Sequence, residues 1–287
     1  MVYKTSFPFI AKLLNKQVED PIIAIDVGCR WGFADKFLSL EEGIQLYGFD
    51  PDQDECAALE KRYNAQNIHL IPLGLSNEVG QKKLYITKEP ACSSLYKPSS
   101  YLTDRMPALQ CAKEEKQADI DVTTLDIWAK DNDITRIDYL KLDTQGSEYD
   151  ILQGGNRLLS TVRFLEIEVE FNPIYEGQPL FSDIDLFLRS KGLELWGFKN
   201  FVHYGEGEDS EILLAPRYVH YDENQYETPA RGGQLFWADA IYVHKEIVRA
   251  QSSIIGKGQR RRDLILADAL GMHDIANRLH DRSKGIT

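Results

Sequence analysis

The chain has 287 residues, of which 43% are hydrophobic and 27% charged, a composition typical of a globular protein with one large domain or two small ones. Its formal net charge of −12 argues against a nucleic-acid partner, because phosphate contacts need clustered Lys and Arg. The four cysteines lack the C-x-x-C spacing of a zinc site, and no apolar run predicts a membrane span or a signal peptide. We therefore expect a cytoplasmic protein.

Short apolar runs alternate with helical patterns along most of the chain. Strands are predicted, in chain order, at 22–27, 44–49, 68–75, 137–143, 163–171, 193–198 and 235–245. Helices are predicted between them at 33–42, 52–65, 123–131, 147–159 and 181–192. This alternation predicts an α/β fold with a Rossmann-like, doubly wound, seven-stranded sheet. An irregular stretch joins the last two strands, which favours a final antiparallel strand.

The sequence divides into three predicted parts. Residues 1–20 are expected to form an N-terminal helical segment, residues 21–247 the α/β domain, and residues 248–287 a C-terminal helical tail. The tail carries eight Lys or Arg against four Asp, so we expect it to dock on the acidic body or on a second subunit of a homo-oligomer. Binding of an anionic partner is the alternative. Segments 86–120 and 199–234 are expected to be loops that shape a substrate pocket.

The first predicted strand ends in the sequence IDVGCRWG, residues 25–32. A dinucleotide loop would read G-x-G-x-x-G, but here Asp26 precedes a turn with Gly28 and Gly32. A carboxylate repels a pyrophosphate and attracts an ammonium group. S-adenosyl-methionine, which carries an ammonium, a carboxylate and a sulfonium, fits such a turn. Arg30 either neutralises the methionine carboxylate or faces water, and the whole motif is also compatible with a glycine turn and a helix-capping Asp.

The second and third strand ends favour a nucleoside ligand. Asp50 lies 22 positions after Gly28, a spacing at which an acid accepts hydrogen bonds from ribose hydroxyls in both NAD and S-adenosyl-methionine sites. Asp50 is alternatively a cap for the helix that follows. Leu75 and Ser76, after the third strand, are placed where an adenine would lie.

The chain resembles FkbM-type methyltransferases over about residues 20–245. The resemblance rests on the ordered segments IDVGCRWG, GFDPDQ, IPLGLSNEVG, VTTLDIW, KLDTQGSEYDILQGG and FLEIEVEFNPIYEGQPLF. It implies a Rossmann-like methyltransferase domain that uses S-adenosyl-methionine to methylate hydroxyl groups on sugars, polyketides or related small molecules. The chain departs from the family at Cys29-Arg30-Trp31, at Asp50, where relatives often carry Glu, and at Gln145, where many carry Glu.

Methylation of a sugar hydroxyl needs a general base or a metal, because the hydroxyl is a poor nucleophile. Asp143 follows the fourth strand, and Glu166, Glu168 and Glu170 share one face of the fifth. We expect Asp143 and Glu168, the latter matching the family pattern, to act as the base or to hold a divalent ion such as Mg²⁺. His203 is an alternative base.

The sequence therefore predicts an S-adenosyl-methionine-dependent O-methyltransferase that acts on a sugar, glycan or other small-molecule acceptor. A nicotinamide-dependent oxidoreductase on the same fold is a second hypothesis, disfavoured by the missing dinucleotide fingerprint. A non-catalytic scaffold that only binds the cofactor is a third, disfavoured by the retained acids.

Overall fold

The computed structural model describes residues 20–205, 217–221, 224–228, 233–249 and 256–281. The expected N-terminal helical segment lies, apart from its last residue, outside the described residues. No helix in the described part of the chain is both long enough and apolar enough to cross a membrane.

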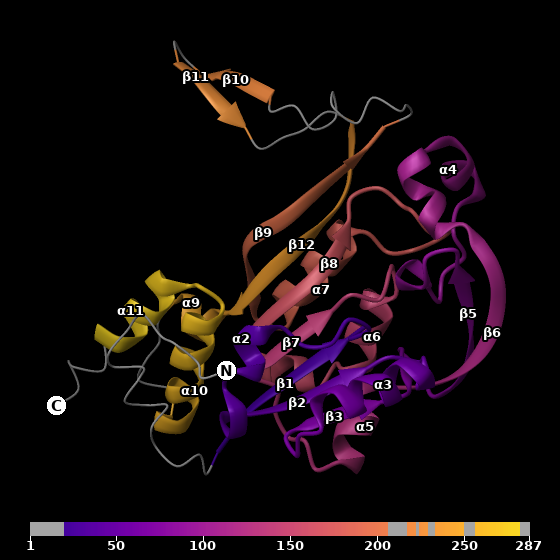
Figure 1. Ribbon diagram of the computed structural model, residues 1–287. Helices are drawn as coiled ribbons and strands as arrows, with labels where there is room; N and C mark the ends of the chain where they lie inside the picture. Colours follow the sequence, from indigo (N-terminus) through magenta and orange to yellow (C-terminus); the bar gives the residue numbers. More distant parts are fainter. Residues whose placement is uncertain (1–19, 206–216, 222–223, 229–232, 250–255, 282–287) are drawn as a thin grey trace.

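A seven-stranded sheet forms the centre of the molecule (Figure 1). Its strands, in spatial order, are β3 (Ile68–Ile71), β2 (Ile44–Phe49), β1 (Ile22–Val27), β7 (Tyr139–Leu142), β8 (Phe164–Glu170), β12 (Gln234–His244) and β9 (Leu193–Tyr204). The pairs from β3 to β8 are parallel, whereas β12 runs antiparallel to both β8 and β9. The predicted fold class is confirmed. The last strand of the sheet in chain order, β12, is antiparallel and lies between β8 and β9.

Helices cover both faces of this sheet because its central strands are apolar on both sides. One face packs against α2 (Asp35–Leu38), α3 (Gln53–Tyr63), α9 (Lys245–Val248), α10 (Lys257–Ala269) and α11 (His273–Asp281). The other packs against α5 (Leu125–Asp131), α6 (Glu148–Gly154) and α7 (Phe181–Ser190). In β1, Ile22 and Ala24 point to the first face, and Ile23 and Ile25 to the second.

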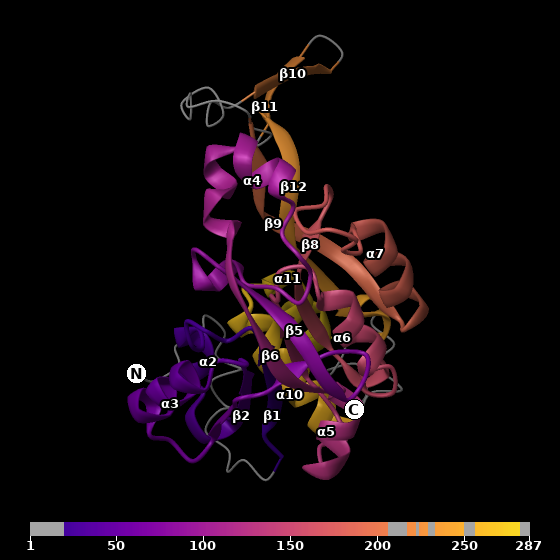
Figure 2. The same ribbon diagram turned by 90° about the vertical axis from the view of Figure 1, so that its right-hand side faces the viewer.

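A smaller sheet stands beside the main one, on the side of its carboxyl-terminal strand ends (Figure 2). Its strands pair in the order β4 (Gly74–Leu75), β6 (Glu114–Thr123) and β5 (Gly80–Thr87). Between β5 and β6 the chain forms η2 (Pro90–Cys92), α4 (Ser100–Arg105) and η3 (Pro107–Ala112). Two further short helices are η1 (Glu41–Gly43) and η4 (Leu158–Thr161), and a separate hairpin consists of β10 (Arg217–Tyr221) and β11 (Asn224–Thr228).

The structure corrects several predicted boundaries. The strand predicted over 68–75 is two strands in different sheets, because Pro72 lacks the N–H that a ladder needs. The helix predicted over 33–42 shrinks to α2 and η1, and the one over 147–159 ends at Gly154. Segment 86–120, predicted as loop, contains α4 and most of β6. That strand was missed because only Ala118, Ile120 and Val122 alternate as apolar residues on one of its faces, while its first four residues are polar or charged.

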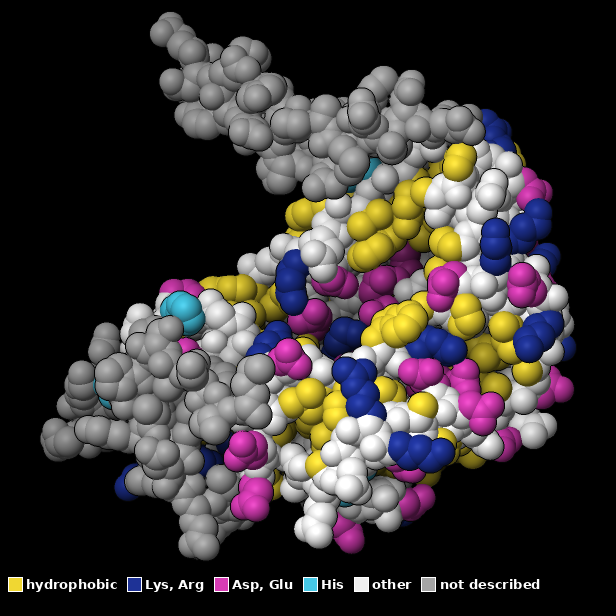
Figure 3. All heavy atoms as spheres, viewed as in Figure 1, with side chains coloured by type: hydrophobic (Ala, Val, Ile, Leu, Met, Phe, Trp, Pro, Cys, Tyr) yellow, Lys and Arg dark blue, Asp and Glu magenta, His cyan; other side chains and the backbone are white. Residues whose placement is uncertain are grey.

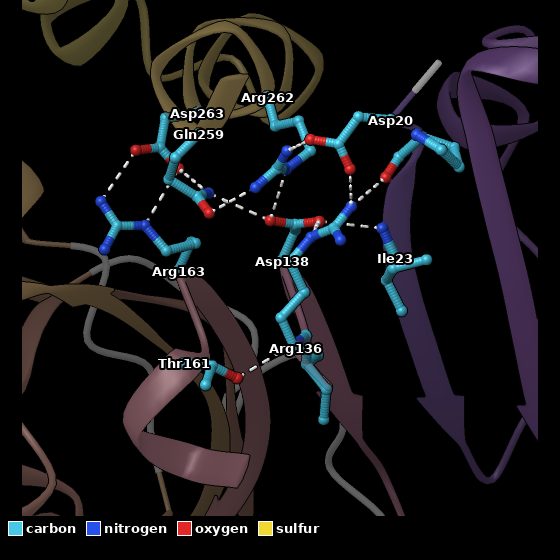
Figure 4. A network of polar contacts seen from close by, with 11 residues as sticks. Asp20, Ile23, Arg136, Asp138, Thr161, Arg163, Gln259, Arg262 and Asp263 are labelled. Carbon is cyan, nitrogen blue, oxygen red and sulfur yellow. Dashed lines mark hydrogen bonds and ion pairs between the residues drawn. The ribbon is translucent and has the colours of Figure 1, made fainter. Parts of the chain in front are cut away.

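The C-terminal helices dock on the body of the same chain through a buried ionic network (Figure 4). Asp138, fully buried just before β7, accepts hydrogen bonds from Arg262 Nε and Gln259 Nε2 of α10, each at 3.0 Å. Its other oxygen accepts from the backbone N–H of Ile23 at 2.9 Å and from Arg136 Nε at 3.3 Å. One carboxylate therefore ties α10 to the amino-terminal ends of β1 and β7.

A second buried pair reinforces this docking. Arg163, at the start of β8, donates two parallel hydrogen bonds to the carboxylate of Asp263 in α10, at 3.0 and 2.8 Å. Neighbouring apolar residues of the helix, such as Leu264 and Leu266, are buried in the core below the sheet. The expected helical tail is thus present, and its apolar face is covered by its own chain.

We predict that Asp138→Ala lowers the free energy of unfolding by about 3 kcal/mol or more, because it strips a buried arginine of a partner. Urea unfolding followed by circular dichroism measures the loss. Asp104→Ala is the control, because its pair with Lys113 is exposed and is worth less than about 1 kcal/mol. Equal losses in the two variants would contradict the role of the network.

Candidate active site

A tight glycine turn after β1 brings three strand ends together. Gly28 has φ +84°, a conformation that favours glycine, and a Cβ there would lie 1.9 Å from the carbonyl oxygen of Asp143. The N–H groups of Gly28 and Cys29 donate to the carbonyl of Phe49 at 2.9 and 3.1 Å. Gly32, with φ +82°, leaves room for the hydroxyl of Tyr63. The turn therefore packs directly on the backbone that carries Asp143.

A cavity of about 690 Å³ lies over these strand ends, bounded on its far side by the smaller sheet. Gly28, Asp50, Leu75, Asp143 and Glu168, all predicted site residues, line it. This volume is in the range of cofactor-sized pockets, roughly 300–1,000 Å³. Residues from segment 86–120 also line the cavity, as expected, among them Cys92 and Cys111.

Four predicted site residues lie outside that lining. Asp26 lies within β1, one residue before its end, and Gly32 packs on Tyr63. Ser76 is fully buried, with its N–H donating to the carbonyl of Thr123. His203 lies inside β9, not after the strand as expected, because β9 runs on to Tyr204 to pair with β12.

Asp50 presents its carboxylate to the cavity. The side chain is 6% exposed, and Oδ1 accepts a hydrogen bond from the N–H of Asp52 at 2.8 Å. Burial raises the pKa of Asp50, and this hydrogen bond opposes the rise. The helix cap is Asp52, whose Oδ1 accepts from two N–H groups of α3, so Asp50 is left for another role. Arg30 also lines the cavity and pairs with Asp52 at 3.2 Å.

A lysine that the sequence analysis missed connects two of the predicted acids. Lys141 of β7 stands between Asp26 on the neighbouring strand, with Nζ 3.6 Å from Oδ1, and Asp143, with Nζ 3.1 Å from Oδ2. Burial nonetheless raises the pKa of Asp26 to about 6, because desolvation outweighs the attraction of Lys141. The sequence held a sign of this contact, because Lys141 and Asp143 are alternate residues and therefore fall on the same face of a buried strand.

Gln145 joins the two acids proposed for catalysis. Its Nε2 donates to Asp143 Oδ1 at 3.1 Å and to Glu168 Oε1 at 3.0 Å. Its Oε1 accepts from the hydroxyl of Tyr175 at 3.1 Å, and its carbonyl accepts from Ser94 Oγ at 2.6 Å. Gln145 has φ +59°, an uncommon conformation for a residue with a side chain. The surrounding contacts hold it there.

Further buried carboxyl groups lie close to Asp143. Glu148, at the start of α6, accepts hydrogen bonds from the N–H groups of Thr144 and Gly146, yet burial raises its pKa to about 7. Burial, with the charges of Asp143 and Glu170, raises the pKa of Glu168 well above its ordinary value. These shifts favour neutral carboxyl groups, which donate hydrogen bonds, beside Asp143.

The donor set fits a metal poorly. No group of three His, Cys, Asp or Glu side chains arranged to hold an ion occurs among the described residues. Between Asp143 and Glu168 lies the amide nitrogen of Gln145, a donor where an ion would need an acceptor.

The sheet order, with its antiparallel strand between the fifth and sixth strands, and the acid-flanked glycine turn define a Rossmann-like methyltransferase. A family model described as the methyltransferase FkbM domain matches residues 26–195. The chain therefore belongs to the FkbM methyltransferase family, a membership that favours methyl transfer over the oxidoreductase hypothesis.

The chain is also similar to individual proteins. The chain is 28% identical to the 2-O-methyltransferase NoeI of Sinorhizobium fredii (strain NBRC 101917 / NGR234) over 215 residues, which are 71% of this chain and 82% of that protein. The magnesium protoporphyrin IX methyltransferase (ChlM) from Synechocystis PCC 6803, solved with bound SAM, matches 82% of this chain and 76% of its own at 11% identity and a TM-score of 0.35. A SAM-dependent methyltransferase from Anabaena variabilis ATCC 29413 matches 83% and 84% at 12% identity and a TM-score of 0.35.

We predict that Asp26→Asn stabilises the protein increasingly as the pH rises. Because the pKa of Asp26 is raised by folding from 3.8 to about 6, ionisation of this group destabilises the wild type across that window. The advantage of the variant in free energy of unfolding should widen by about 1 kcal/mol between pH 5 and pH 7.5. Urea unfolding at both pH values measures it, with the exposed Asp119→Asn as control. A constant difference would refute the assignment.

Proposed function

We propose that this methyltransferase transfers a methyl group from S-adenosyl-methionine to a hydroxyl of a sugar or of a small molecule that carries one. The observation that carries the proposal is one cavity lined by both the Gly28 turn with Asp50 and the bridged acids Asp143 and Glu168. The similarity to an enzyme named as a 2-O-methyltransferase supports oxygen as the accepting atom.

The residues around the glycine turn fit this cofactor. Asp50 turns a buried carboxylate with one remaining acceptor oxygen toward the cavity, which suits the two ribose hydroxyls. Leu75 supplies an apolar wall for the adenine. Lys141 already faces Asp26, so the ammonium role expected for Asp26 would require Lys141 to move. We therefore assign Asp26 to holding Lys141.

The acid pair is proposed to manage the proton of the acceptor hydroxyl. When bound, the cofactor supplies an electrophilic methyl group. Asp143, beside the ammonium of Lys141, is the group that accepts the hydroxyl proton. Glu168, kept neutral by burial and by neighbouring acids, donates a hydrogen bond that orients the acceptor. Two carboxyl groups whose environments differ in this way divide base and donor roles between them.

We propose that this proton transfer proceeds without a divalent ion bound to the acid pair. An ion shared by Asp143 and Glu168 would have to displace the amide of Gln145 from both carboxylates. The Mg²⁺ hypothesis remains open to test through the same assay. A cytoplasmic location and a homo-oligomer stay predictions.

Two variants separate the proposed roles. Asp143→Asn should slow methyl transfer by roughly 10²- to 10⁴-fold, because it removes the base, while the Kd for S-adenosyl-methionine stays within about threefold. Asp50→Ala should weaken cofactor binding by about tenfold or more, because a charged hydrogen-bond acceptor is lost. Calorimetry measures binding, and transfer of labelled methyl to a panel of sugars and nucleotide sugars measures turnover.

The matched control is Glu60→Ala, an exposed change on α3, which should alter neither quantity. Every rate is measured with added magnesium and with a chelator, and a chelator that abolishes turnover would overturn the metal-free mechanism. Cofactor binding unchanged in Asp50→Ala would remove the ribose role, and a wild-type rate in Asp143→Asn would remove the base.

A further inference from the structure

A second cavity lies on the same face of the main sheet as the acid pair. It has a volume of about 210 Å³ and is enclosed by β8, β9, β12 and the connection between α10 and α11. Most of its wall is apolar: Phe164, Trp196, Ile241, Leu270 and Met272 line it. Trp196 is 38% exposed, a high value for a large aromatic side chain. The cavity therefore combines an apolar interior with access from solvent.

One end of this cavity is charged. Glu166 of β8 accepts from the hydroxyl of Tyr139 at 3.2 Å and pairs with Lys199 of β9 at 2.8 Å, and all three residues line the cavity. Both contacts use Oε2 of Glu166. Lys199 keeps 43% of its side chain exposed. Polar groups grouped at one end of an apolar pocket fix the orientation of a ligand.

The strand register places this charged end next to the catalytic acids. Glu166 and Glu168 are alternate residues of β8, so their side chains leave the same face about 7 Å apart. In the strand register, Glu168 lies opposite Asp239 of β12, and Asp239 lies opposite Lys199 of β9. Figure 3 shows this face hollowed over β8 and β12, with acidic and basic side chains gathered in the hollow. The charged groups Glu166 and Lys199 therefore lie between the acid pair and the apolar part of the cavity.

We propose that this cavity is the subsite for an apolar substituent of the acceptor. The inference rests on the proposed function: a hydroxylated group lies at Asp143 and Glu168, and an alkyl or aryl group attached to it extends past Glu166 and Lys199 into the cavity. An apolar cavity of about 150 Å³ is sufficient for benzene, so this one accommodates a phenyl ring or a short alkyl chain. The acceptor class is thus a glycoside with an apolar aglycone, not a free sugar.

The test uses a series of β-D-glucopyranosides with methyl, butyl, hexyl and phenyl aglycones as probes. Calorimetry with the full-length protein, with and without S-adenosyl-homocysteine, measures each affinity. Each added methylene should tighten binding by about three- to fourfold, because it leaves water for an apolar wall. Hexyl glucoside should also change the fluorescence of the wild type, and Trp196→Phe should remove that change.

Met272→Trp fills the cavity and should abolish the dependence of affinity on chain length while leaving the methyl glucoside unaffected. Leu186→Trp, which adds the same side chain at a 74% exposed position on α7, should keep the dependence. An affinity that does not rise from methyl to hexyl in the wild type overturns the proposal, as does a rise that survives Met272→Trp.

The proposed function can fail separately. If S-adenosyl-methionine does not bind, or no methyl group is transferred, while affinity still rises with chain length and falls in Met272→Trp, the methyltransferase mechanism is wrong and the apolar subsite stands. If the cofactor binds and methyl transfer occurs with equal efficiency for methyl and hexyl glucosides, only the subsite is wrong.

Discussion

The gathering of carboxyl groups, two of them buried, at the ends of β7 and β8 is the constraint around which this site is built. Asp143, Glu148 and Glu168 stand within one small region, and burial raises the pKa of the last two. Such a cluster costs stability unless its members are hydrogen-bonded. The fold supplies the amide of Gln145, the ammonium of Lys141 and the N–H groups of Thr144 and Gly146, which precede α6. These donors hold the acids close together, as the proposed division of roles in one proton transfer requires.

The same region is fixed to the glycine turn after β1, the proposed cofactor site, by backbone packing. Gly28 lies against the carbonyl of Asp143, so any displacement of the turn also displaces the proposed base. Farther down the sheet, Asp138 and Arg163 anchor the C-terminal helices to the amino-terminal ends of the same strands. The buried ionic network thus lies at one end of the sheet and the proposed active site at the other, as expected for a parallel sheet with ligands at its carboxyl ends.

Much of this could be predicted from the sequence because it depends on local pattern. Apolar runs ending in Asp26, Asp50 and Asp143 located three strand ends, and the topology brought them to one edge. The cross-strand partners could not be predicted, since the distance from Lys141 to Asp26 depends on strand order. Strand β6 was missed because its apolar stripe is confined to Ala118, Ile120 and Val122, and the rest of the strand is polar or charged. His203 was placed outside its strand because nothing local marks where β9 ends.

The central claim is that Gln145 joins Asp143 and Glu168 into one acid–base unit. Its most direct test is the pH dependence of kcat for methyl transfer in Gln145→Met, which keeps the side-chain length and removes both donated hydrogen bonds. Those bonds stabilise ionised carboxylates. The account predicts that the acidic limb of the profile moves to higher pH by about one unit. A profile of unchanged shape, lowered only in its maximum, would contradict it.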